Sequence, residues 1–193
     1  NPFESPRQRD YPLPPLRSMG YAELASQAMQ GQGYHPFPQP AGIISKDYDN
    51  RPACSYCGFC GGFGCWNNAK SSTLVSAIPA AEKTGKLEIR PNSRVMKILS
   101  DKGGHVTGVQ YLDDSGNLVE QPAGMVILST YVYENSRLLL LSTGDAYANG
   151  LSNNHGQVGK HYLSHVYVTV NGLFPGKALN LYSGTTGQAT AMI

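Results

Sequence analysis

Four cysteines within twelve residues are the part of this sequence best suited to chemistry. The segment CSYCGFCGGFGC has the spacing C-x2-C-x2-C-x4-C, and the chain has no other cysteine. Short glycine-rich links allow successive thiolates to converge on one small cluster, as they do in ferredoxins. The spacing therefore favours an iron–sulfur cluster whose ligands are Cys54, Cys57, Cys60 and Cys65.

Two other uses of these thiols stay open. Structural zinc sites usually pair two C-x-x-C units across a longer segment, which this run lacks. Disulfides form in export compartments, and a pair such as Cys54 and Cys57 is close enough in sequence to be bridged. The proline that follows the last cysteine of bacterial ferredoxins is replaced here by Trp66, whose side chain we expect to be buried.

Composition excludes several classes of partner. The 193 residues carry a net charge of +2, charged residues make up only 15%, and Lys and Arg are scattered. No basic patch of the kind that binds nucleic acid is present, and no apolar run approaches the roughly 18 residues of a membrane span. We therefore expect no nucleic-acid partner and no direct membrane span. Because the chain does not begin with Met, we expect it to be a piece of a longer protein.

The first half of the chain is rich in turns and must position the cysteines. Five prolines among the first fifteen residues predict an extended arm over residues 1–18. Helical spacing of Ala, Leu and Met predicts a helix over 20–30. After the cysteines, residues 67–85 read as a helix that Asn68 or Ser71 caps and that Pro79 kinks or splits.

The second half alternates between strand and helix patterns. Two strand-like pieces flank Pro91, a hairpin follows over 105–123, and the continuous apolar run 125–129 is typical of a buried strand. A helix is predicted over 134–142, and alternation over 165–174 predicts the first strands of a mainly antiparallel sheet. This order predicts an α/β fold with an antiparallel insertion.

The order and spacing of these segments resemble a known family. Residues 69–142, from AKSSTLVSAIP to ENSRLLLLS, look like the middle of a glucose-methanol-choline (GMC) flavin oxidoreductase. The likeness is to the bacterial sugar and sugar-acid dehydrogenase branch, typified by gluconate 2-dehydrogenase flavoprotein subunits. It runs back through RPACSYCGFC at 51–60 and on through VGKHYLSH at 158–165.

This resemblance implies a fold, a cofactor and a reaction. The chain would supply part of a Rossmann-like FAD-binding domain with an antiparallel insertion, leading into the substrate domain. On that reading, residues 1–66 are a proline-rich arm, short helix and Cys-rich loop, 67–160 the central part of the FAD-binding domain, and 161–193 the start of the substrate-domain sheet. The implied reaction is oxidation of the CH–OH group of a sugar, polyol or sugar acid by hydride transfer to flavin.

The resemblance also implies which residues contact FAD. The position of Val95 typically reads the adenine through its backbone amide and carbonyl. The turn beside the dinucleotide carries Ser129, Thr130 and Tyr131, where family members more often have a glycine-containing turn. The segment that leads to the flavin and the substrate domain adds two further candidates, Asn68 and Ser71.

Other family features are not found in the sequence. The chain contains no G-x-G-x-x-G turn between a strand and a helix, and the family's catalytic His lies beyond the matched region, so His165 is not that base. We therefore expect the 193 residues alone to be inactive. Close relatives carry a three-iron cluster that passes electrons to a cytochrome subunit, which makes a cytochrome and a small subunit candidate partners and favours a periplasmic or membrane-associated location. The alternative is a non-catalytic binding, electron-transfer or assembly module with a Cys-ligated cluster.

Overall fold

A computed structural model describes residues 6–60, 62–179 and 190–191. The chain divides into two compact units, Asn1–Leu87 with Gly172–Ile193, and Glu88–Asn171. Each unit is described by itself. The domain boundaries predicted at 66/67 and 160/161 stay a prediction.

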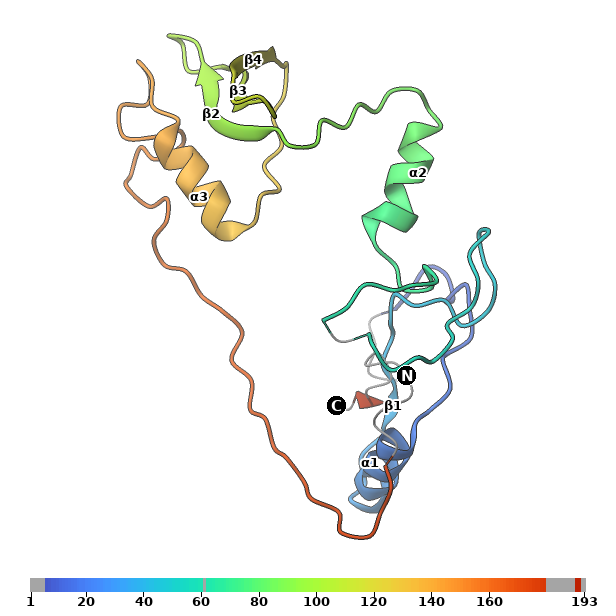
Figure 1. Cartoon of the computed structure of the whole chain (residues 1–193). Helices are drawn as coiled ribbons and strands as arrows, with labels where there is room; N and C mark the ends of the chain where they lie inside the picture. The colour runs from blue at the N-terminus through green and yellow to red at the C-terminus, as the bar shows by residue number, and fades with distance from the viewer. Residues whose placement is uncertain (1–5, 61, 180–189, 192–193) are drawn as a thin grey trace. The chain divides into compact units, whose positions relative to one another are not determined.

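The unit Glu88–Asn171 is an antiparallel sheet with one helix packed on it (Figure 1). Three strands, β2 (Arg94–Ser100), β3 (Val106–Leu112) and β4 (Leu118–Pro122), lie in the order β2-β3-β4. Helix α3 (Val132–Leu141) packs against β2. The hairpin and the helix confirm the prediction, and the sheet with its helix makes an α/β unit, although no Rossmann-type parallel sheet is formed by the described residues.

The turn between β3 and β4 forms where the sequence predicts it. Asp113 Oδ1 accepts hydrogen bonds from the backbone N–H groups of Ser115 (3.0 Å) and Asn117 (2.8 Å), so a single carboxylate closes the turn. Gly116 has a φ of 80°, which only glycine adopts without strain. These local interactions fix the register from Leu112↔Leu118 onward.

The core of this unit lies between β2 and α3. Ile98, Leu138 and Leu151 are buried together, and Leu128 is among the half-buried side chains that pack against them. The one polar side chain that is fully enclosed among the described residues is Ser142, at the end of α3. The core therefore brings the strand that carries Val95 against the helix that follows the 129–131 turn.

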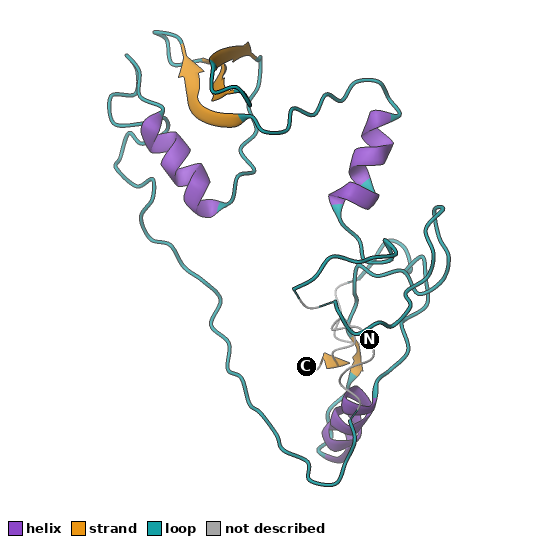
Figure 2. Cartoon of the chain, viewed as in Figure 1, coloured by secondary structure: helices purple, strands orange, loops and turns teal. Residues whose placement is uncertain are grey.

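The other unit contains little regular structure (Figure 2). It has helix α1 (Gly20–Gly31), the short pair β1 (Phe37–Pro38) and β5 (Thr190–Ala191), the 3-10 turn η1 (Thr73–Val75) and helix α2 (Ala77–Glu82). The predicted helix 20–30 is confirmed. Loops hold the rest of the unit together, as its proline content predicts.

The helix predicted after the cysteines is much shorter than expected. It begins at Ala77 instead of near Asn68, and neither Asn68 nor Ser71 caps it. Pro79 lies in the first turn of α2, where its missing N–H needs no partner, and the break from η1 falls at Ser76. Pro79 therefore sets where the helix can begin and does not kink it.

Three predicted strands are absent from the described residues. Residues 86–90 and 125–129 are not strands, and neither is any part of 161–179. The side chains of Met125 and Val166 are 78% and 96% exposed, although their segments have strong strand patterns. A strand requires a hydrogen-bonded neighbour, and the described residues supply none beside these segments.

No helix within the described ranges is both long enough and apolar enough to cross a membrane.

Candidate functional site

Strand β2 offers an open backbone edge at the position predicted to read adenine. It pairs with β3 on one side and has no strand neighbour on the other among the described residues. The pairing register shifts between Val95 and Lys97, so the residue between them bulges. An unpaired strand edge presents N–H donors and C=O acceptors, the groups that a backbone reading of a purine needs. The surroundings of Val95 therefore fit the contact that the family resemblance implies.

The 129–131 turn lies in the same unit, immediately before α3. Asn135 Oδ1 accepts hydrogen bonds from both the backbone N–H of Thr130 (3.0 Å) and its hydroxyl (2.6 Å). The N–H of Asn135 in turn donates to the Tyr131 carbonyl at 2.8 Å. These three bonds fix the turn against the first turn of the helix. Ser129 is exposed, and its hydroxyl has no partner among the residues that the structure describes.

Tyr131 has a backbone conformation that suits glycine. Its φ of 76° and ψ of 158° fall in a region that is essentially restricted to glycine. The family resemblance implies a glycine-containing turn at this place, and the backbone of Tyr131 has a conformation that glycine adopts without strain. Strain of this kind is concentrated at binding sites, which supports a functional role for the turn.

Two further tyrosines gather beside this turn. The ring of Tyr133 lies 5.5 Å from that of Tyr131 and 5.3 Å from that of Tyr162. The hydrogen bond from the Tyr133 hydroxyl lowers the pKa of Tyr162 and raises the pKa of Tyr133. Sequence reasoning missed both residues. The repeated aromatic in TYVY could have indicated Tyr133, whereas only the fold brings Tyr162 beside it.

Asn68 and Ser71 belong to the other unit. Asn68 has a φ of 61°, and its carbonyl accepts a hydrogen bond from Arg51 Nη1 at 3.3 Å. The backbone N–H of Ser71 donates to the carbonyl of Gly42. Both residues thus build the loop that carries the cysteines, and their proposed contact with flavin stays a prediction.

The Cys-rich loop is closed at its base by a short extended segment, residues 42–44. The Ile44 carbonyl accepts the N–H of Cys54, and the Ile44 N–H donates to the carbonyl of Ala69, each at 3.0 Å. Inside the loop, Lys70 Nζ donates to the carbonyls of Cys60 (2.7 Å) and Phe63 (3.2 Å). Backbone bonds and one lysine therefore hold a loop that has no regular secondary structure.

Cys65 lies in a cradle of backbone amides. Burial by itself raises the pKa of its thiol, but the N–H groups of residues 67–70, with Lys70 foremost, outweigh burial and lower the pKa. The Lys70 N–H lies 3.4 Å from Cys65 Sγ, and the thiol donates to Asn67 Oδ1 at 3.0 Å. Amide donors aimed at sulfur stabilise a thiolate, which is the form that binds metal.

The pKa of the Cys54 thiol is shifted in the opposite direction, upward. Burial raises the pKa of the Cys54 thiol, repulsion from the other three thiolates adds to this, and the Tyr56 N–H offsets it only in part. All four cysteines are free, and within the described ranges no three potential ligands are gathered as a metal-binding group. The chemistry of the donor set fits a metal cluster, but the thiols do not surround a common point.

Trp66 is not buried as we expected. Its side chain is 75% exposed, so it covers neither the cysteines nor a core within the described residues. The turn of the chain between Cys65 and Asn68, which is closed by an N–H to carbonyl bond of 3.3 Å, leaves Trp66 on the outside of the loop.

Comparison with known proteins identifies the relatives of this chain. Residues 31–167 match the GMC oxidoreductase family. The whole chain is 34% identical to the gluconate 2-dehydrogenase flavoprotein of Pantoea cypripedii, of which the match covers 32%. It is 26% identical to the fructose dehydrogenase large subunit of Gluconobacter japonicus, over 83% of the chain and 29% of the relative.

A third relative acts on a smaller alcohol. The 2-methyl-1,2-propanediol dehydrogenase of Mycolicibacterium austroafricanum is 27% identical over 90% of the chain, which is 31% of the relative. The chain thus spans about a third of the length of the curated relatives it matches.

Proposed function

The chain belongs to the GMC oxidoreductase family, whose members bind FAD, and we propose that it forms part of a dehydrogenase for the CH–OH group of a sugar, polyol or sugar acid. The observation that carries this proposal is the match of residues 31–167 to the family. The names of the relatives, which are a gluconate, a fructose and a diol dehydrogenase, support the substrate class.

The geometry of the unit Glu88–Asn171 supports a role in holding FAD. The open edge of β2 at Val95 would bind the adenine through backbone groups. The turn at 129–131, which Asn135 fixes, would lie along the dinucleotide with the exposed hydroxyl of Ser129 available to it. When bound, FAD would supply the acceptor for a hydride from the substrate carbon. The residues of this chain would bind and orient the cofactor.

The experiment that tests this function uses the full-length protein. It should be purified with its flavin, and candidate substrates should be added in the absence of oxygen. Loss of the oxidised-flavin absorbance with gluconate, fructose or a related polyol would support the proposal. Retention of the oxidised spectrum with every compound of the class would contradict it. The 193 residues alone should show no turnover.

We propose second that Cys54, Cys57, Cys60 and Cys65 would hold an iron–sulfur cluster, which would supply an acceptor for electrons from the flavin. The specific observation in its favour is the amide cradle that lowers the pKa of Cys65. A cytochrome with a small subunit would then receive the electrons, at a periplasmic or membrane-associated location. Zinc and disulfides are the competing interpretations of the same four residues.

Iron analysis separates these interpretations. We expect the full-length protein to contain about three irons per chain and a paramagnetic signal from oxidised iron, and Cys65→Ser to lose both. Zinc in place of iron would overturn the cluster proposal, and so would an absence of metal with the thiols oxidised in pairs. Neither result would affect the proposed flavin chemistry, since that is read from the flavin absorbance.

A further inference from the structure

Lys70 contacts the Cys-rich loop through both its side chain and its backbone. The side-chain ammonium donates to the carbonyls of Cys60 at 2.7 Å and of Phe63 at 3.2 Å. The backbone N–H of the same residue donates to Cys65 Sγ at 3.4 Å. Lys70 therefore ties together the last two cysteine positions of the run, and the family resemblance gives it no role.

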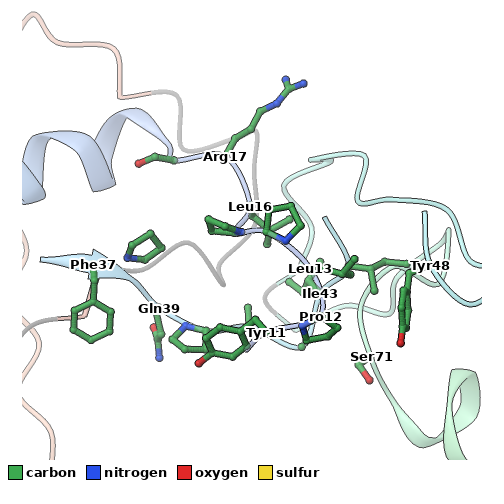
Figure 3. Close-up of a pocket in the computed structure, with 18 of the residues that line it drawn as sticks. Tyr11, Pro12, Leu13, Leu16, Arg17, Phe37, Gln39, Ile43, Tyr48 and Ser71 are labelled. Atoms are coloured by element: carbon green, nitrogen blue, oxygen red, sulfur yellow. The ribbon is translucent and has the colours of Figure 1, made fainter. Parts of the chain in front are cut away.

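The backbone of Lys70 is fixed by a short extended segment beside it. Lys70 forms an isolated antiparallel bridge with Ile43, and hydrogen bonds on both sides of this bridge join residues 42–44 to Ala69 and Ser71. Successive side chains of an extended chain point in opposite directions. Ser71 and Ile43 accordingly line the pocket that Figure 3 shows, whereas Lys70 does not line it and its side chain reaches the loop. The paired backbone thus directs the ammonium at the cysteines.

No carboxylate neutralises this ammonium within the part of the chain that the structure describes. Lys70 is half-buried, and the ion pairs of the described residues do not include it. Residues 50–81 contain no Asp or Glu, so the cysteines are the groups in this stretch that ionise most readily to anions. Two carbonyls satisfy the donors of the ammonium but leave its charge unpaired. The charge is therefore placed where metal-bound thiolates would be its natural counterpart.

We propose that Lys70 is a positioning residue for the cysteines, which holds the loop at Cys60 and Phe63 and whose positive charge raises the reduction potential of the metal cluster. The role of the charge rests on the iron–sulfur cluster proposed above. Potentials of such clusters depend on net charge, on hydrogen bonds to sulfur and on solvent exposure. A nearby cation favours the reduced form, which carries one more negative charge. Lys70 would thus favour electron transfer from the flavin to the cluster.

The first test examines the loop and needs no cluster. Chymotrypsin cleaves after Phe, and the side chains of Phe59 and Phe63 are 64% and 62% exposed. Lys70→Met keeps the backbone N–H and the length of the side chain but loses both bonds of the ammonium. In full-length protein freed of metal by a chelator, we expect this variant to be cleaved in the loop about tenfold faster than the parent, because local opening becomes easier.

Matched controls separate local release from loss of folding. Lys46→Met removes the same charge from an exposed side chain of the same unit, and it should be cleaved at the parent rate. Mass spectrometry of the fragments should show that Lys70→Met is cleaved faster in the loop only, with the other sites unchanged. Equal cleavage of the loop in the parent and in Lys70→Met would overturn the positioning role, and so would faster cleavage throughout the chain.

The second test examines the charge, by redox titration of the iron-containing full-length protein followed by electron paramagnetic resonance. We expect Lys70→Met to have a lower potential than the parent and Lys70→Arg, which keeps the charge, to return toward the parent value. The shift should shrink in 1 M salt, where the screening length falls to about 3 Å. Lys46→Met should keep the parent potential. A role in folding alone would produce neither the rescue by Arg nor the dependence on salt.

The outcomes distinguish this inference from the proposals on which it draws. An unchanged potential in a Lys70→Met protein that retains its iron would overturn the role of the charge, and so would a shift that Lys70→Arg does not reverse. Absence of iron from the parent would overturn the cluster and this role with it, while the cleavage rates would still decide whether Lys70 holds the loop. Neither test depends on flavin reduction, so the proposed oxidation of a CH–OH group is judged separately.

Discussion

The hydroxyl of Ser142 accepts the backbone N–H of Ile98 at 2.9 Å, across 44 residues of sequence and in a buried position. The same hydroxyl donates to the Leu138 carbonyl at 2.6 Å. One side chain at the end of α3 therefore satisfies a backbone group of β2 on the edge that has no strand neighbour among the described residues. This bond joins β2 to the end of α3. The proposed cofactor contacts lie on the same two elements, at Val95 in β2 and at Tyr131 immediately before α3.

Replacing Ser142 by Ala should destabilise the protein by about 1–3 kcal/mol, because the Ile98 N–H would be left buried without an acceptor. The measurement is the free energy of unfolding by denaturant. Ser136→Ala is the matched control, since Ser136 makes a similar bond to the carbonyl four residues earlier but is only half-buried and bonds to no other element. Its effect should be below about 0.5 kcal/mol. Equal effects of the two substitutions would show that the bond to Ile98 contributes nothing.

Replacing Asn135 by Ala should weaken FAD binding. Asn135 Oδ1 is the single acceptor for both the N–H and the hydroxyl of Thr130, so its loss releases the turn at 129–131 at a cost of about 1 kcal/mol for the lost hydrogen bonds. The measurement is the dissociation constant of FAD in the full-length protein, with the exposed Asn154→Ala as control. Unchanged FAD affinity in a folded Asn135→Ala protein would remove this turn from the cofactor site.

Replacing Tyr131 by Gly should raise the free energy of unfolding by about 1 kcal/mol, because the backbone conformation at this position is strained for any residue with a Cβ atom. Tyr131→Phe keeps the strain and should leave stability unchanged. The test is a comparison of thermal or denaturant unfolding of the three proteins. A loss of stability in the glycine variant would mean that the ring contact with Tyr133 outweighs the strain.

The thiols of Cys65 and Cys54 should differ in how their reactivity depends on pH, because their pKa values are shifted in opposite directions. In metal-free protein, the alkylation of Cys65 by iodoacetamide should reach half its maximal rate below the ordinary thiol pKa, and that of Cys54 above it. Any stability that the Cys65 thiolate contributes is present above its unfolded-state pKa and is lost as pH falls through the lowered folded-state pKa. Mass spectrometry of the labelled peptides gives both rates. Coinciding profiles would contradict the amide cradle at Cys65.

Local signals predicted the elements that local interactions form. The helix α1 and the β3–β4 hairpin appear where expected, because the helical spacing of apolar residues and the turn residues that specify them lie within a few positions of each other. The predicted start of the helix after the cysteines was wrong. Pro79 is tolerated only in the first turn of a helix, and this constraint on the start outweighs the preference of Asn68 or Ser71 for the N-cap position.

Sequence patterns predicted less well those elements that need a partner far away in the sequence. The apolar run 125–129 has a strand pattern, but pattern alone does not provide the neighbouring strand that completes its hydrogen bonds. The same limit applies to the site. The resemblance pointed to Val95 and the 129–131 turn, whereas the role of Asn135 depends on a three-dimensional contact that no spacing reveals.

The most direct measurement for the central claim is the anaerobic flavin spectrum of the full-length protein during addition of sugars, polyols and sugar acids. We predict that at least one compound of this class bleaches the oxidised flavin, and that the same compound with its reacting CH–OH already oxidised does not. A protein that binds FAD but stays oxidised with all of them would contradict the assignment as a CH–OH dehydrogenase.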